Sequence, residues 1–206
     1  MRLDHLRYSG LSKKAKKEHF SRLIQADPVL WDALHRVRSL NLSDWWLVSG
    51  ALYNSVWNAL TGRAHGYGIK DIDVAYFDDR DISWEAEDKV IQAGASVFAG
   101  FPLPVEIRNQ ARVHLWFEKR FNKPYMPLRC ASESIERYAA IAHCVGVRLE
   151  IDGRLTIHAP FGFNDIFSFR IRPNRAIDNR ETYDIKARRA LEHWPELIVQ
   201  CWGEQG

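Results

Sequence analysis

Residues 70–77, KDIDVAYF, decide how the middle of the chain folds. Polar and apolar side chains alternate along this run, as they do along a β-strand whose two faces differ. Asp71 and Asp73 then share one face, while Ile72 and Val74 take the other. The sequence therefore predicts a strand that buries its apolar face and carries two carboxylates on the opposite one.

A glycine turn lies upstream of this strand. Residues 44–49 (DWWLVS) form a short apolar run typical of a buried strand, and the apolar positions of residues 52–60 have helical spacing. Between them stands Ser49-Gly50-Ala51. Glycine permits close approach to the backbone, and the N-terminus of a helix offers unpaired N–H groups to an anion. We therefore expect this turn to bind phosphate.

A third carboxylate follows downstream, in residues 105–108, which also resemble a strand. Val105 and Ile107 would face away from Glu106, so Glu106 could join the face that carries Asp71 and Asp73. Two aspartates two residues apart are weak evidence alone, and an exposed acidic pair at a sheet edge is the alternative. Three carboxylates on one face would supply the oxygen ligands that a divalent metal ion such as Mg²⁺ prefers.

Basic and aromatic residues follow Glu106 closely. Residues 112–117 also alternate, which predicts another strand, and Arg108 and Arg112 could then point at phosphate oxygens. Trp116 could stack on a nucleotide base. Arg63 and Lys70 flank the loop that contains Gly66 and Gly68 and could screen phosphate charge, but exposed basic residues near loops usually have no specific role.

The remaining pattern predicts an α+β fold, close to α/β, with a central mixed sheet, flanking helices and an N-terminal helical hairpin. Length and hydrophobic content favour one domain over residues 1–206, with a hairpin at 1–42, a catalytic core at 43–128 and a completing segment at 129–206. Helices are expected at 12–26, 28–40, 83–93, 132–142 and 182–194, and further strands at 145–151, 155–158 and 166–171.

Composition narrows the class of protein. No apolar run is long enough to span a membrane, and the first twenty residues have no apolar signal-peptide core. Three cysteines without a CxxC pair indicate neither a disulfide framework nor a sulfur-rich zinc site. We expect a cytoplasmic protein without a membrane partner.

The glycine turn, the DxD strand and the later acidic residue together resemble the polymerase-β nucleotidyltransferase superfamily. A closer resemblance, from Trp46 to Tyr183, is to a family of small bacterial nucleotidyltransferase-like proteins of unassigned substrate. Ala51 departs from the superfamily, which often has serine there, and Ser49 or Asn54 would have to replace the missing hydroxyl. The blocks that carry the closer resemblance are GALYNSVW, GIKDIDVAYFD, RNQARVHLW and APFGFNDIF.

The resemblance implies transfer of a nucleotidyl group from an NTP to an unidentified hydroxyl acceptor, with Mg²⁺ or Mn²⁺ as cofactor. Asp71, Asp73 and Glu106 would be the catalytic metal ligands, and Glu106 a candidate base. Two alternatives stay open: a catalytically idle module that binds nucleotide or nucleic acid, and a glycosyltransferase that uses DxD with a metal. The residues that would bind nucleotide are Ser49, Gly50, Ala51, Asn54, Arg108 and Arg112.

Overall fold

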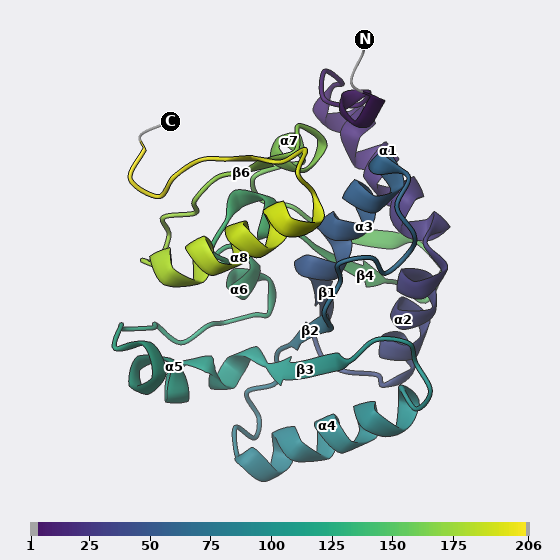
Figure 1. Cartoon of the computed structure of the whole chain (residues 1–206). Coiled ribbons are helices and arrows are strands. Elements are labelled where there is room, and N and C mark those ends of the chain that lie inside the picture. The colour runs from purple at the N-terminus through teal and green to yellow at the C-terminus, as the bar shows by residue number, and fades with distance from the viewer. Residues whose placement is uncertain (1–3, 205–206) are drawn as a thin grey trace.

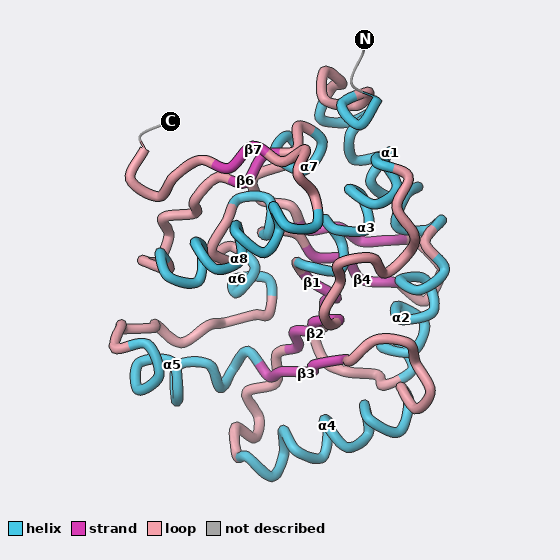
Figure 2. Tube along the Cα trace, in the orientation of Figure 1, coloured by secondary structure: helices cyan, strands magenta, loops and turns pink. Residues whose placement is uncertain are grey.

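The computed structural model describes residues 4–204, and its centre is a five-stranded mixed sheet (Figures 1 and 2). The strand order is β3-β2-β1-β4-β5; β2 and β3 run parallel, and the other neighbours are antiparallel. A two-stranded parallel sheet, β6-β7, lies apart from it. The predicted α+β fold with a mixed sheet is confirmed. The strands are β1 (Trp46–Val48), β2 (Ile72–Tyr76), β3 (Val105–Asn109), β4 (Gly146–Leu149), β5 (Leu155–His158), β6 (Arg170–Ile171) and β7 (Ile198–Val199).

The helical hairpin expected at the N-terminus is formed by α1 (Lys13–Ala26) and α2 (Pro28–Ser39). Ser12 caps α1, and the side chain of Asp27 accepts hydrogen bonds from two backbone N–H groups at the start of α2. The other helices are α3 (Gly50–Thr61), α4 (Trp84–Val97), α5 (Val113–Phe121), α6 (Ser132–Ile135), α7 (Asn164–Phe167) and α8 (Arg180–His193), with 3₁₀ turns η1 (Asp4–Leu6), η2 (Gln110–Arg112) and η3 (Ile141–His143).

One face of the sheet packs into the main hydrophobic core. Ile72 and Val74 of β2 lie there, as alternation predicts, beside Leu47 and Ile107 from the neighbouring strands. The same cluster includes buried residues of α1, α2 and α3. Helix α4 lies against β3 (Figure 1), where a Cβ added to Gly94 would stand 2.4 Å from Ile107 Cδ1. This close packing fixes the apolar face and leaves the other face to the polar residues.

The opposite face is only half covered. Over β1 and β4 it carries a smaller cluster in which Trp46, Val48 and Cys144 pack with Ile135 of α6. The approach is so close that a Cβ on Gly146 would lie 2.6 Å from Ile135 Cδ1. Over β2 and β3 the same face borders a cleft instead. The sheet therefore presents one covered half and one open half on a single face.

The strand predicted at residues 112–117 is wrong, because this segment forms η2 and the first turn of α5. The Asn109 side chain accepts the N–H of Ala111 and begins the turn. Val113 and Phe117 are buried, four residues apart on one side of the helix, while Leu115 and Trp116 are exposed. The apolar residues at helical spacing outweigh the local alternation.

The helix predicted at 132–142 is also wrong beyond its first turn, since α6 ends at Ile135. The residues that were expected to continue this helix form hydrogen bonds with residues 172–174 instead. Asn174 donates its side-chain amide to the Glu136 carbonyl and its backbone N–H to the Ala139 carbonyl, and Ile141 N–H bonds the Arg172 carbonyl. These long-range hydrogen bonds replace the helical ones.

The strand predicted at 166–171 divides into two elements. Residues 164–167 form α7, and only Arg170 and Ile171 are extended, pairing with β7. Ile166 and Phe167 are fully buried, and a short apolar run does not distinguish a buried strand from a buried helical turn. Asp165, which the helix buries, pairs with Arg172 at 2.9 Å.

The helices of residues 4–204 include none with the length and apolar character needed to cross a membrane.

Candidate active site

The turn between β1 and α3 is strained at Ser49. This residue has φ of 56° and ψ of −117°, a region that favours glycine, and its N–H is held by the Val145 carbonyl at 2.9 Å. The Ser49 side chain does not cap α3. The first N–H groups of a helix have no partners within the helix, so those of Gly50 and Ala51 are available to an anion.

Asp73 and Glu106 are neighbours across the parallel strands β2 and β3. The register places them directly opposite each other, and the adjacent pair Val74 and Ile107 faces the core. Their side chains therefore lie on the open face, as alternation predicted. Asp71, which the sequence placed inside the strand expected at residues 70–77, comes one residue before β2.

The carboxylate of Asp73 forms no salt bridge and no hydrogen bond with the side chains and backbone groups of residues 4–204. Burial raises the pKa of Asp73 to about 6, and the nearby Asp71 and Glu106 carboxylates add to this rise, while Lys186 opposes it. A carboxylate that is desolvated and lies near two others is costly to keep ionised. Binding of a cation at this site would therefore stabilise the ionised form of Asp73.

The other two carboxylates are turned toward basic neighbours. Asp71 Oδ2 lies 2.9 Å from Lys70 Nζ, and the pKa of Lys70 is raised by this hydrogen bond. Glu106, which is half exposed, lies 3.8 Å from Arg108 Nη2. In the described part of the chain, no three His, Cys, Asp or Glu side chains are gathered closely enough to hold a metal ion. Asp71, Asp73 and Glu106 border the same region without forming a closed cage.

A small pocket of about 70 Å³ lies on the Asp71 side of Asp73. Gly50 and Asn54 of α3 line it, and the buried Asn54 Oδ1 has no hydrogen-bond partner. From the opposite side α8 contributes Lys186 and Arg189. Polar oxygen, helix N–H groups and two cations make this pocket suitable for a phosphate chain.

Sequence reasoning missed Lys186 and Arg189. They are exposed residues of α8, whose buried side carries Tyr183, Ala187 and Ala190. Nothing local distinguishes them from the other basic residues of this helix. Gly68, with φ of 67°, lets α8 approach, because a Cβ there would meet the Trp194 ring at 2.6 Å.

The residues predicted to bind nucleotide do not all lie at the same cavity. Arg108 is exposed beside Glu106, but Arg112 is held by an ion pair with the buried Glu87 and by the Ile82 carbonyl. Ser49 lines the larger cleft described below. Ala51 is buried, and its side chain lines neither cavity.

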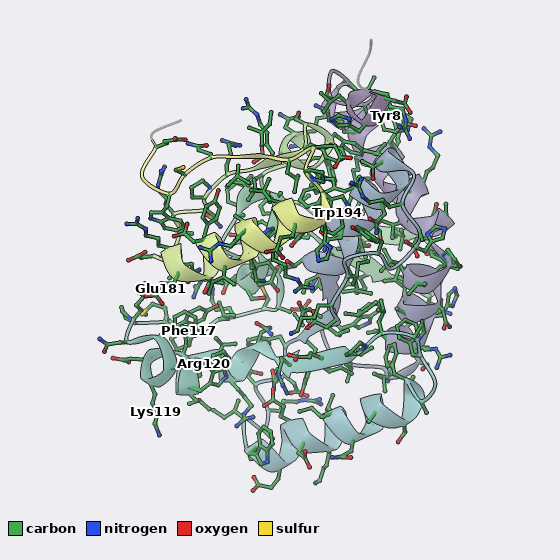
Figure 3. All side chains as sticks on the ribbon, in the orientation of Figure 1. Tyr8, Phe117, Lys119, Arg120, Glu181 and Trp194 are labelled. Atoms are coloured by element: carbon green, nitrogen blue, oxygen red, sulfur yellow. The ribbon has the colours of Figure 1, made fainter. Side chains whose placement is uncertain are left out.

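A second, larger cleft of about 850 Å³ lies on the Glu106 side of Asp73. Its walls come from the end of β3, α5, α6 with the turn after it, and the first half of α8. In Figure 3, Phe117 and Arg120 lie on α5 below the start of α8, which Glu181 marks, and Trp194 marks the other end of α8. Of the two described cavities that border Asp73, the larger one opens toward α5.

The donor set fits a hard divalent cation. Carboxylate oxygen is the ligand type that Mg²⁺ and Mn²⁺ prefer, and the nearby Lys186 and Lys70 lower the cost of ionising Asp73 without forming a salt bridge to it in residues 4–204. A helix N-terminus and basic side chains beside these carboxylates can hold phosphate at the same time. The arrangement can therefore bring a metal, a polyphosphate and a third group together around Asp73.

Two comparisons with known proteins found a match. A family model described as "Nucleotidyltransferase" matches residues 35–199. A solved structure whose description reads "The NMR structure of the protein reveals a CCA-adding enzyme head domain" is similar, with a TM-score of 0.73 and 24% sequence identity. The similarity covers 94% of this chain and 99% of that one, and it shows the shared fold. No curated protein matches the chain.

Proposed function

Because the chain belongs to a nucleotidyltransferase family, we propose that it transfers a nucleotidyl group from an NTP to a hydroxyl acceptor, with a divalent metal ion held by Asp71, Asp73 and Glu106. The observation that carries this proposal is the state of Asp73. It is desolvated, lies opposite Glu106, and has neither a salt bridge nor a hydrogen bond in the described part of the chain. A bound cation would remove this electrostatic cost.

The small pocket would hold the triphosphate. Gly50 places the N-terminus of α3 at this pocket, and a Cβ there would meet the protein only at 3.9 Å or more, so the glycine leaves room for a ligand. The unpaired Asn54 Oδ1 can accept from a sugar hydroxyl or a water. Lys186 and Arg189 would neutralise phosphate oxygens from the side of α8.

Glu106 would orient the acceptor hydroxyl and take its proton. It is exposed on the open face, next to the position where the transferred phosphate meets Asp73. Mg²⁺ or Mn²⁺ bound at these carboxylates would stabilise the charge that develops on the phosphate oxygens.

One hydrophobic cluster joins α1, the sheet and α8, which supports treating residues 1–206 as a single domain.

The alternative of an idle nucleotide-binding module is favoured by Ala51. Alanine has no hydroxyl to donate to phosphate at this position, where many members of the superfamily have serine. The free N–H groups of the turn and the cations of α8 would bind phosphate in both cases, so they do not separate the two, and the family match favours the enzyme. The DxD glycosyltransferase receives no support from the family match.

The test compares the wild type with the double variant Asp71→Asn and Asp73→Asn. Wild type should be stabilised in thermal melts by NTP together with Mg²⁺ or Mn²⁺, because a ligand that binds the native state raises its melting temperature. The double variant should fold and lose this metal-dependent stabilisation. An unchanged response in the double variant would reject the site. Pyrophosphate release with an acceptor panel would then separate the enzyme from the idle module.

A further inference from the structure

The larger cleft holds a combination of groups that the proposed chemistry at Asp73 does not use. Its outer wall is α5 and the chain that follows it, and its volume of about 850 Å³ is more than ten times that of the small pocket, which is about 70 Å³. Trp116 and Phe121 on this wall are 40% and 39% exposed. Large aromatic side chains that are left exposed beside an active site commonly contact a ligand.

The two cavities meet at two residues. Asp73 and Lys186 are the residues of the described chain that line both. If the triphosphate occupies the small pocket, as the proposed function requires, the phosphorus under attack lies near this junction. The attacking and leaving oxygens of phosphoryl transfer are roughly in line. Pyrophosphate therefore leaves on the Gly50 side, and the acceptor hydroxyl enters from the larger cleft.

Arginine side chains and aromatic rings are in contact with each other on the wall of the cleft. Arg120 lies over the ring of Phe121 at 5.4 Å, and Arg137 lies over Tyr125 at 4.7 Å. Arg120 forms no ion pair with any described residue, and Arg108 has only its long contact with Glu106. A ligand that is complementary to these arginines and rings carries several negative charges together with flat groups that can stack on the rings.

We propose that this cleft binds a single-stranded nucleic acid and presents its terminal hydroxyl to the NTP as the acceptor. This proposal rests on the proposed function for the transfer step. The hydroxyl oxygen forms a bond to the α-phosphorus, and the bond from that phosphorus to the oxygen bridging to the β-phosphate breaks. Pyrophosphate leaves, and the hydroxyl proton passes to the Glu106 carboxylate and then to water.

The chemistry of the wall favours a single strand over other anionic acceptors. In a duplex the faces of the bases are covered by their neighbours, so Trp116 and Phe121 would have nothing to stack on except at an end. An acidic peptide matches the charges but lacks regularly spaced rings. A single strand supplies a phosphate and a base at every step.

The experiment measures binding of a fluorescein-labelled single strand of about 12 nucleotides, as RNA and as DNA, by fluorescence anisotropy. NTP is omitted and EDTA is added, so that the measurement does not depend on Asp73 or on metal. The variants are Trp116→Ala and Arg120→Ala, whose side chains are exposed. Arg22→Ala is the matched control, because Arg22 is an exposed arginine of α1, outside the cleft. Thermal melts establish that each variant is folded.

We expect Trp116→Ala to weaken binding about tenfold, through the loss of base stacking. Arg120→Ala should weaken it about threefold or more and lower the slope of log affinity against log salt by about 0.7, the value for one lost phosphate contact on a single strand. Arg22→Ala should bind as wild type does. A duplex of the same sequence and poly-glutamate should compete poorly.

Equal binding by Trp116→Ala, Arg120→Ala and wild type would overturn the proposal, as would equal competition by poly-glutamate. Metal-dependent stabilisation by NTP distinguishes this failure from failure of the proposed function. If NTP still stabilises the wild type while the single strand does not bind, the acceptor assignment is wrong and the transferase site stands. If the strand binds through Trp116 and Arg120 but NTP has no effect, the cleft assignment stands and the transfer step is wrong.

Discussion

The two halves of one sheet face differ in what covers them. Over β1 and β4, Ile135 packs on Trp46, Val48 and Gly146 with no room for a further methyl group at Gly146. Over β2 and β3, Asp73 and Glu106 face a cleft. The covered half contributes to the stability of the fold, and the open half carries an electrostatic cost that a ligand can remove. The free energy of unfolding should therefore respond in opposite ways to substitutions in the two halves.

The largest expected effect is in the covered half. Ile135→Ala removes a fully buried side chain from a tightly packed contact and should lower the free energy of unfolding by about 3 kcal/mol. Urea denaturation measures this change. Ile151→Ala is the matched control, because Ile151 is 96% exposed, and it should change stability by less than about 0.5 kcal/mol. Similar losses at both positions would contradict the packing described for α6.

An effect of opposite sign is expected at Asp73. Its pKa is raised to about 6 in the folded protein from an ordinary value of 3.8, so between these values the native state holds more protons than the unfolded state. Stability then falls as the pH rises from about 4 to about 6 and stays at the lower level above that. Asp73→Asn removes this loss and should be more stable than wild type by about 2 kcal/mol at pH 8 without metal.

The advantage of Asp73→Asn should vanish below about pH 4, where Asp73 is protonated in both states of the wild type. Denaturation curves of both proteins at several pH values, with EDTA present, give the comparison. Adding Mg²⁺ at pH 8 should stabilise wild type and leave the variant unchanged. A variant that is less stable than wild type at pH 8 without metal would contradict the environment assigned to Asp73.

The smallest effect on stability is expected at Glu106. This side chain is half exposed and has only a long contact with Arg108, so Glu106→Gln should change the free energy of unfolding by about 0.5 kcal/mol or less. Its transfer activity should nevertheless fall about 100-fold, because the amide cannot accept the acceptor's proton. Pyrophosphate release against time measures the activity. Full activity in this variant would remove Glu106 from the proposed mechanism.

Several local elements could be read from the sequence because their signals lie within a few residues. Alternation gives β2 and separates Ile72 from Asp73, and the helix expected from residue 83 begins where Ser83 accepts the N–H of Ala86 and caps α4. The same rule failed at residues 112–117, where Val113 and Phe117 fit a helix as well as a strand. The spacing of apolar residues predicts an element only when it fits the period of a helix or that of a strand, and not both.

The sequence by itself determined that Asp73 and Glu106 would each oppose an apolar neighbour on its strand, because the side-chain period of a strand is two. Only the tertiary structure placed the two carboxylates opposite each other, since register depends on the parallel pairing of β2 with β3. It also brought Lys186 to Asp73 from more than 100 residues away in the chain, through the packing of α8. Long-range packing makes such contacts, and no local pattern records them.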